Sequence, residues 1–376
     1  MAKLGEICKI NMGQSPDSAT YNTENKGLPF FQGNADFGKT FPKVRMWCSE
    51  PKKIAKENDV LISVRAPIGA MNIADCECCI GRGLAALTPN EECCSQKYLW
   101  HALGSKVDEL NSKGTGSTFK AISKKTLEET EIVLPSIEVQ NRIAKILDKI
   151  DRIVDNRCRQ VDRLDELVKS RFIEMFGDPS TNSTEWSLIK LEDYLDIIGG
   201  YAFKSDSFQE EGIPILRIGN INSGKFLPVN MVYWPDDDDL ARYKVYPGDL
   251  VMSLTGTVGK DDYGNVCILD GAYSVYYLNQ RNAKLILKSS LNKVFLAEML
   301  KFKEIKNRLT KISRGVRQAN ISNKDILSLE IPLPPLVLQN QFADFVAQVD
   351  KSKLVVQKSL EQLKILKKAL MQEYFG

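Results

Sequence analysis

Residues 134–177 read LPSIEVQNRIAKILDKIDRIVDNRCRQVDRLDELVKSRFIEMFG, and residues 333–376 read LPPLVLQNQFADFVAQVDKSKLVVQKSLEQLKILKKALMQEYFG. The two stretches align without a gap at an offset of 199 (333 − 134), so that Gln140, for example, returns as Gln339. Self-similarity at a fixed spacing is typical of a structural unit that occurs more than once. The chain is therefore interpreted as two copies of one unit.

A weaker form of the repeat continues upstream of each stretch. Its matches are Gly116, Ile122, Ser123 and Lys125 at +199, Asp59, Ser63 and Gly69 at +190, and Gly33–Asn34 and Gly38–Lys39 near +186. The drift in offset is what loops of different length produce. We therefore divide the chain into a first module (residues 1–133), a central segment (134–177), a second module (178–332) and a C-terminal segment (333–376).

Each of the two repeated segments is predicted to be one long helix. Prolines stand at its start, at Pro135 and at Pro334–Pro335, and no glycine interrupts it before the terminal Gly177 or Gly376. Apolar residues recur at seven-residue spacing, the pattern of helix-on-helix packing. The residues predicted to form this seam, and to support partner docking, are Ile143, Leu147, Ile150, Val154, Val161 and Leu164 in the first segment and Phe342, Val346, Val349, Val356, Leu360 and Leu363 in the second.

The apolar seams predict that the two helices pair with each other. About 40 residues at 1.5 Å each make a rod of roughly 60 Å, whose apolar stripe would otherwise face water. Because the intervening module must carry the chain back, an antiparallel coiled coil with an internal pseudo-twofold repeat is favoured. The alternative is that each helix lies on its own module.

The modules themselves are predicted to be α+β. Short runs such as DVLISVRAPIG (59–69) and GDLVMSLTGTVG (248–259) combine β-branched residues with turn signals. Helices are predicted at Gln96–Leu110 and Leu291–Leu309. Two similar modules at the ends of a rod suggest two readers held at a fixed spacing on DNA, since symmetric readers contact half-sites about one helical turn apart.

A basic loop rich in small residues precedes each long helix, at residues 113–125 and 311–324. Glycines permit close approach, hydroxyls suit phosphate oxygens, and Lys or Arg adds counterion release. Arg pairs with guanine edges, and Gln or Asn with adenine edges. The DNA-binding candidates are Lys113, Thr115, Ser117, Thr118, Lys120 and Lys124 in the first loop and Lys311, Arg314, Arg317, Gln318 and Asn320 in the second. The alternative is a solvated loop, which recurrence in both units makes less favourable.

Further candidates lie at or near the ends of expected strands, beside turn residues. They are Arg65, Arg82, Arg217, Asn220, Lys260 and Arg281. For each of these taken singly, an ordinary surface position remains the simpler interpretation. The net charge of +3 does not by itself indicate or exclude a nucleic-acid-binding protein, because binding depends on where the positive charges are placed.

Several classes of site are excluded or disfavoured. The single histidine, His101, rules out a His-based triad or a multi-His metal site. TGTVGK at 255–260 lacks the first glycine and the final Ser or Thr of a phosphate loop. Asp236–Asp239 is interpreted as a solvated acidic turn. The cysteines Cys76, Cys78, Cys79, Cys93 and Cys94 lack spaced C-x-x-C pairs and are interpreted as buried apolar thiols, so no metal site and no catalytic residue is expected.

A cytoplasmic location is expected. The N-terminus MAKLGEICKINMG has no signal-peptide core, and no apolar run approaches the roughly 18 residues of a membrane-spanning helix.

Specific strings resemble the specificity subunit of type I restriction–modification systems along the whole chain. They are DVLISVRAPIG, GDLVMSLTGTVG, AISKKTLEETEIVLPSIEVQNRIA and ANISNKDILSLEIPLPPLVLQNQF, and each half ends in Phe-Gly. This chain departs from the pattern in starting almost at Lys3–Leu4, without the lead that precedes Lys190–Leu191.

The resemblance implies that the modules are target-recognition domains, each reading half of an asymmetric bipartite site in double-stranded DNA. It implies that the long helices set the spacing and dock two modification subunits, and that restriction subunits join the complex. S-adenosylmethionine, ATP and magnesium would then be bound by the partners and not by this chain, which would have no small-molecule substrate. The alternatives are a specificity subunit of a related methylase–nuclease system, a coiled-coil adaptor that does not bind DNA, and an enzyme in its own right.

Overall fold

The computed structural model describes residues 1–116, 120–288, 290–310 and 318–376. The chain divides into two compact units, and each is described by itself. Unit 1 consists of Met1–Arg159 and Gln357–Gly376, and unit 2 of Gln160–Val356. Both units contain short strands and helices together with part of each long helix, so the fold is α+β, as predicted.

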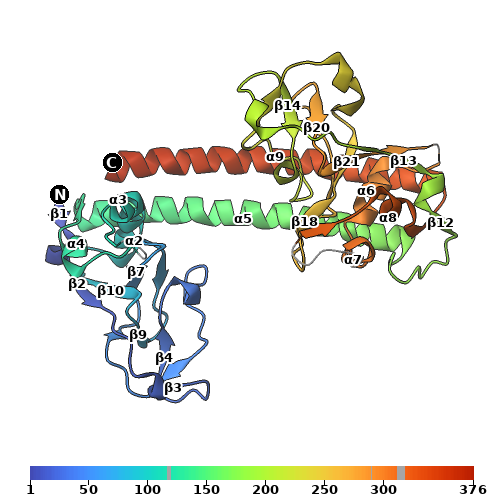
Figure 1. Cartoon of the computed structure of the whole chain (residues 1–376). Coiled ribbons are helices and arrows are strands. Elements are labelled where there is room, and N and C mark those ends of the chain that lie inside the picture. Colours follow the sequence, from blue (N-terminus) through green and yellow to red (C-terminus); the bar gives the residue numbers. More distant parts are fainter. Residues whose placement is uncertain (117–119, 289, 311–317) are drawn as a thin grey trace. The chain divides into compact units, whose positions relative to one another are not determined.

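The two long helices are present where the sequence predicts them. Helix α5 spans Ile137–Phe176 and helix α9 spans Leu336–Phe375, each with 40 residues (Figure 1). Both begin a few residues after a leucine–proline step, because the residue before a proline is disfavoured in helical geometry.

In unit 1 the start of α5 packs beside the end of α9. Ile143 and Leu147 lie in the same buried cluster as Phe375. The ammonium of Lys367 is paired with the carboxylate of Asp151. The two helix segments therefore run in opposite directions within this unit.

In unit 2 the end of α5 packs beside the start of α9. The ring of Phe172 meets that of Phe342 edge-on at 5.3 Å, and Val346 and Val349 join the same core. Lys353, almost fully buried, pairs with Asp165 of α5. The direction is again antiparallel within the unit.

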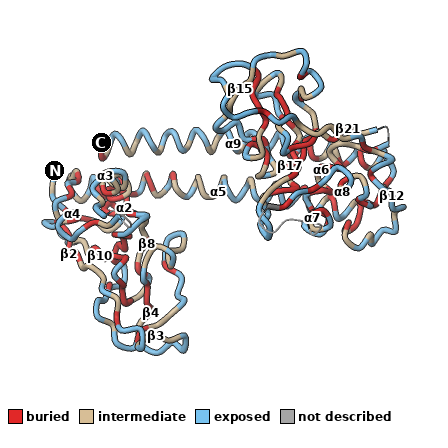
Figure 2. Tube along the Cα trace, viewed as in Figure 1, coloured by how far each residue is buried: buried red, intermediate tan, exposed pale blue. Residues whose placement is uncertain are grey.

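Burial along the predicted seam follows the modules. The residues nearest the modules are buried, and those further along are half-buried (Figure 2). Buried seam residues are Ile143, Leu147, Ile150, Phe342, Val346 and Val349; half-buried ones are Val154, Val161, Leu164, Val356, Leu360 and Leu363.

The module of unit 1 is built on two sheets. The first, antiparallel, has the order β2-β10-β7-β8 (Cys8–Met12, Leu84–Pro89, Val60–Ser63, Met71–Ile73). The second has the order β3-β5-β4-β9-β6 (Tyr21–Asn22, Trp47–Cys48, Leu28–Phe31, Cys78–Ile80, Ile54–Ala55), with β4 and β9 parallel. Strands β1 (Ala2–Lys3) and β11 (Glu131–Ile132) form a small ladder, and the short helices are α1 (Leu4–Ile7), α2 (Gln96–Ser105), α3 (Val107–Ser112) and α4 (Lys124–Glu128).

The module of unit 2 repeats this plan. Its first sheet has the order β13-β21-β17-β19 (Leu195–Gly199, Asn282–Leu287, Leu250–Ser253, Val266–Ile268). Its second has the order β15-β14-β20-β16 (Tyr233–Trp234, Ile213–Leu216, Tyr276–Leu278, Lys244–Val245), with β14 and β20 parallel. Two-stranded ladders join β12 (Leu188–Lys190) to β23 (Glu330–Pro332) and β18 (Thr255–Thr257) to β22 (Gln318–Asn320), and the short helices are α6 (Lys293–Leu300), α7 (Lys303–Thr310) and α8 (Asn323–Leu327).

The expected helices at Gln96–Leu110 and Leu291–Leu309 are each broken in two. The amide of Lys106 donates to Leu103 O, and the amide of Phe302 donates to Met299 O. These bonds span three residues instead of four, so the helix tightens and stops before the next helix begins.

One match in the upstream repeat is corrected by the strand registers. Ile62 pairs with Met71 in unit 1, and Met252 with Val266 in unit 2, so the offset is 190 (252 − 62) before the connection and 195 (266 − 71) after it. The partner of Gly69 is therefore Gly264, not Gly259. Both donate their amide to the matched serine carbonyl, Ser63 O at 2.9 Å and Ser253 O at 2.8 Å. Unit 2 thus carries five extra residues between β17 and β19.

A buried glutamine near the start of each long helix fixes that helix to its module. Gln140 accepts a hydrogen bond from Ser95 N and donates to Cys93 O and Pro135 O, over 2.8–3.0 Å. Gln339, at +199, accepts from the backbone amide of the residue that caps α6 and donates to two backbone carbonyls in the same way. Both side chains are fully buried. The glutamine that opens each repeat is thus a structural clamp.

Among the described residues, no helix combines the length and apolarity that crossing a membrane requires.

Candidate nucleic-acid interface

In unit 1 three distant segments meet at one end of the first sheet. The strand end at Val64 donates its amide to Gly83 O at 2.9 Å, and its carbonyl accepts from Ile122 N at 2.9 Å. The residues after β7 therefore lie between the turn that contains Arg82 and the chain that follows the first basic loop. We call this place the basic edge of unit 1.

Four of the candidate residues gather at this edge. Arg65 and Thr115 each form a β-bridge with Ala121, next to Lys120. The side chains of Arg65, Arg82, Thr115 and Lys120 are all exposed. Exposed cations beside backbone and hydroxyl donors are suited to a phosphate backbone.

Two other lysines of the first loop are tied to carboxylates. Lys113 Nζ lies 2.6 Å from Glu109 Oε1, and Lys124 Nζ lies 3.0 Å from Glu128 Oε1. The hydrogen bond from Lys113 is the main reason that the pKa of Glu109 is lowered. Because each of these lysines is already offset by a negative charge, they contribute less to an anion-binding surface than Arg65 or Lys120.

Unit 2 builds the same edge with the same bonds. Leu254 N donates to Arg281 O at 2.8 Å, and Leu254 O accepts from Ile321 N at 2.8 Å. The Arg65–Ala121 bridge of unit 1 is replaced by the β18–β22 ladder, in which Thr255 faces Asn320. Arg281 and Asn320 are exposed. We call this place the basic edge of unit 2.

Lys260 extends the edge of unit 2. It lies in the turn after β18, where its amide donates to Thr257 O at 3.0 Å, and its side chain is exposed. It belongs to the connection that carries the five extra residues.

Arg217 and Asn220 have internal partners. The guanidinium of Arg217 donates to the carbonyl of Asn230. Asn220 is only 2% exposed; its Oδ1 accepts from Arg217 N, and its amide donates to Leu227 O and Val229 O. The side chain of Asn220 thus shapes a loop from a buried position, and its contact with DNA stays a prediction.

Some predictions fall where the structure gives no description. Ser117, Thr118, Lys311, Arg314 and Arg317 lie outside the described residues, as does the side chain of Gln318. Their role in DNA binding stays a prediction.

The cysteine candidates do not gather at one place. Cys78 and Cys79 are adjacent on β9 but belong to different buried clusters, and Cys94 lies in a third. Burial raises the pKa of the Cys79 thiol to about 12. Cys76 and Cys93 are half-buried. For the three buried thiols this is the environment of small apolar side chains, as predicted.

The acidic turn Asp236–Asp239 is held by internal bonds. Lys244 Nζ lies 2.6 Å from Asp236 Oδ1, and this hydrogen bond is the main cause of the lowered pKa of Asp236. Asp237 accepts from Asp239 N at 2.9 Å as a helix cap. The turn is thus ordinary local structure, as the sequence suggested.

Sequence reasoning missed a polar network behind the edge of unit 2. It connects the residues after β18 to helix α7 through Lys306, Asp261 and Tyr263. The trace of this network in the sequence is the change in repeat offset from 190 to 195. That change can be located only when the strand registers are known.

Comparison with known proteins gives one family. A sequence model of the family described as "Type I restriction modification DNA specificity domain" matches residues 1–163 and, a second time, residues 183–364. The chain is 41% identical over 161 residues to the putative type I restriction enzyme MjaX specificity subunit of Methanocaldococcus jannaschii, which covers 43% of this chain and 38% of that protein. It is 28% identical over 291 residues to the MjaVIII specificity subunit of the same organism, which covers 73% of this chain and 68% of that protein.

A solved structure shares the fold over the full chain. The S subunit of the type I restriction–modification system from M. genitalium superposes with a TM-score of 0.61 at 17% identity, covering 100% of this chain and 95% of that one. At this identity the likeness concerns the fold alone.

Proposed function

Because the chain belongs to the family of type I restriction–modification DNA specificity domains, we propose that it is a sequence-specific DNA-binding subunit of a type I restriction–modification complex. In this proposal each module is a target-recognition domain that reads one half of an asymmetric bipartite site. The observation that carries it is the basic edge, built twice on one scaffold by matching backbone bonds and lined by different exposed side chains. Related scaffolds with different surfaces fit two different half-sites.

The long helices are proposed to form one antiparallel coiled coil with a pseudo-twofold repeat. The opposite directions of α5 and α9 within each unit support this, as do the half-buried seam residues between the modules. The coiled coil sets the spacing of the two readers and docks two modification subunits, which restriction subunits join.

The role proposed for this chain is recognition without catalysis. Methyl transfer needs S-adenosylmethionine, and cleavage with translocation needs ATP and magnesium; in the proposal these are bound by the partner subunits. The complex acts in the cytoplasm, where its DNA is.

The test is a methylation map. The modification subunit is expressed in a methylation-free host with and without this chain, and methylated adenines are mapped across the genome. A bipartite motif that appears only with this chain is the expected result. Replacing residues 178–332 by the same region of a relative is expected to change one half of the motif and leave the other.

The alternatives give different results. A soluble complex without any new motif contradicts the specificity assignment and favours a coiled-coil adaptor that does not bind DNA. DNA cleavage at the motif by a single fused partner indicates a related methylase–nuclease system.

A further inference from the structure

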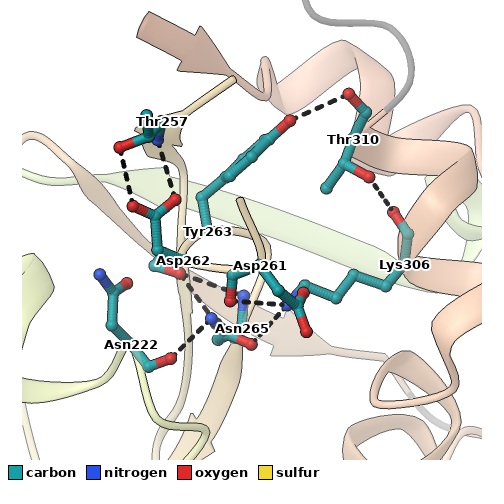
Figure 3. Close-up of polar contacts among 9 residues, drawn as sticks. Asn222, Thr257, Asp261, Asp262, Tyr263, Asn265, Lys306 and Thr310 are labelled. Atoms are coloured by element: carbon teal, nitrogen blue, oxygen red, sulfur yellow. Dashed lines mark hydrogen bonds and ion pairs between the residues drawn. The ribbon is translucent and has the colours of Figure 1, made fainter. Parts of the chain in front are cut away.

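The extra residues of unit 2 form a hairpin that is closed on itself. Asp262 accepts two hydrogen bonds from Thr257, one from the backbone amide at 2.8 Å and one from the hydroxyl at 2.9 Å (Figure 3). Burial raises the pKa of Asp262, but these bonds outweigh it and leave the pKa below its usual value. A Cβ on Gly256 would lie 2.3 Å from Asp262 Oδ1 and 2.8 Å from Tyr263 Cβ, so a larger residue there would displace both side chains.

The hairpin is held from behind by a buried lysine. The side chain of Lys306 on α7 is only 9% exposed, and its ammonium contacts the carboxylate of Asp261 and, at 2.7 Å, Asn265 Oδ1. Asn265 is oriented for this, because its amide donates to Asn222 O at 2.7 Å (Figure 3). A buried ammonium is costly unless its hydrogen bonds are satisfied, so Lys306 holds Asp261 at this position.

A second bond fixes the hairpin's base to the same helix. The hydroxyl of Tyr263, which is 3% exposed, donates to Thr310 O at the end of α7 over 3.0 Å. The tip presents exposed side chains: Val258 is 42% exposed, and Lys260 is also exposed. A firmly held base and an exposed tip suit a reading element.

The first module shows that the fold does not require a lysine at this position. Gly69 and Gly264 are equivalent by their bonds to Ser63 and Ser253. A Cβ on Gly69 would meet Val107. A Cβ on Gly264 would lie 3.2 Å from Ile321, 3.4 Å from Thr310 and 3.6 Å from Lys306, and Lys306 stands at +199 (306 − 107) from Val107. Unit 1 thus has an apolar valine where unit 2 has the lysine. The lysine accompanies the hairpin, which unit 1 lacks.

We infer that the hairpin Thr255–Asp262 is the base-reading element of the second module, with Lys306 as the positioning residue that aims it. This inference rests on the proposed function. Strand β18 of this segment pairs with β22 in a two-stranded ribbon. Such a ribbon fits the major groove of DNA, where an apolar side chain such as Val258 can contact a thymine methyl and a lysine such as Lys260 a guanine. The basic edge of unit 1, without this hairpin, reads its half-site with a shorter connection.

The experiment uses the full chain in complex with its modification subunit and maps methylated sites genome-wide. Lys306→Met keeps the length of the side chain and removes the ammonium; Lys303→Met, an exposed lysine at the start of α7, is the matched control. We expect Lys306→Met to reduce discrimination at bases of the second half-site by about tenfold. The first half-site and the control variant should be unchanged. Asp261→Asn, and the double variant with Lys306→Met, should show the same loss and not its sum, because both act through one contact.

Each result separates the two proposals. If the unsubstituted chain directs no motif, the proposed function fails. If it directs a motif and both Lys306→Met and Asp261→Asn preserve discrimination in each half, the inference about the hairpin is overturned. Equal loss in both halves also overturns it, since that indicates a general defect of folding. Val258→Ser at the tip should alter the second half without lowering the melting temperature; an unaltered second half contradicts the reading role.

Discussion

Gln140 and Gln339 perform the same task in their units, and their burial makes that task measurable. From a fully buried side chain, each satisfies one backbone amide and two backbone carbonyls. Removing such a partner leaves the buried groups unpaired, which costs more than the hydrogen bond contributed. Only an amide side chain of this length can accept one bond and donate two at this position, which explains why a glutamine stands near the start of both long helices.

Gln140→Leu is therefore expected to lower the free energy of unfolding by about 2–4 kcal/mol, from three orphaned backbone groups. Urea denaturation of the full chain measures it. The control is Asn141→Leu, the exposed neighbour on the same helix, which should change stability by less than about 0.5 kcal/mol. Equal effects of the two substitutions would refute the clamp.

His101 makes stability depend on pH. It is 4% exposed with Nε2 at 2.9 Å from Asp148 Oδ1, and burial lowers its pKa despite the nearby carboxylate. An imidazole in the unfolded chain titrates near 6.5. Below that value the unfolded state takes up its proton first, so the free energy of unfolding falls as the pH drops through about 6.5 toward the lower folded pKa.

We expect His101→Gln to reduce this loss of stability between pH 7.5 and 5.5, measured by urea denaturation at both values. Because the chain has one histidine, its imidazole NMR signals report the folded pKa directly. A midpoint above 6.5 in the folded protein would contradict the assignment.

At the scale of elements, the two basic edges are predicted to supply phosphate contacts. Arg65→Ala and Lys120→Ala should each lower DNA affinity for all sequences and reduce the slope of log K against log salt by about one. The measurement is a salt titration of DNA binding by the assembled complex. Lys26→Ala is the control. Lys26 lies before the start of β4, whereas the basic edge lies past the end of β4, where Gln32 approaches Gly83. An unchanged slope in both edge variants would remove this edge from the interface.

The elements also show what a sequence can predict. Helices α5 and α9 follow from a local pattern of apolar residues, prolines and glycines, and their bounds fall within a few residues of those expected. The burial of Asn220 depends on a loop that returns seven to eleven residues later, and no local pattern marks it. The Gly69–Gly264 match required strand pairing across an insertion. The sequence therefore did not predict the contacts that depend on tertiary structure.

At the scale of the whole molecule, unit 1 is assembled from both ends of the sequence. Phe375 of α9 is 3% exposed, lies in the same core as Leu4 and has its ring 5.4 Å from that of Tyr98. Phe375→Ala should destabilise unit 1 by about 3–5 kcal/mol. Hydrogen exchange should show lost protection in β2, β7 and β10 and none in unit 2. Ile365→Ala, at a 64% exposed position of the same helix, is the control. Equal loss in both units would show that they unfold as one.

Unit 2 is contiguous in the chain and unit 1 is not, which gives the protein an order of maturation during synthesis. A ribosome adding 5–20 residues per second makes Tyr98 roughly tens of seconds before Phe375. During that interval the first module has left the exit tunnel with part of its core still open to solvent. The half that is translated first is therefore the half that is finished last, and a nascent-chain chaperone has its longest opportunity to bind there.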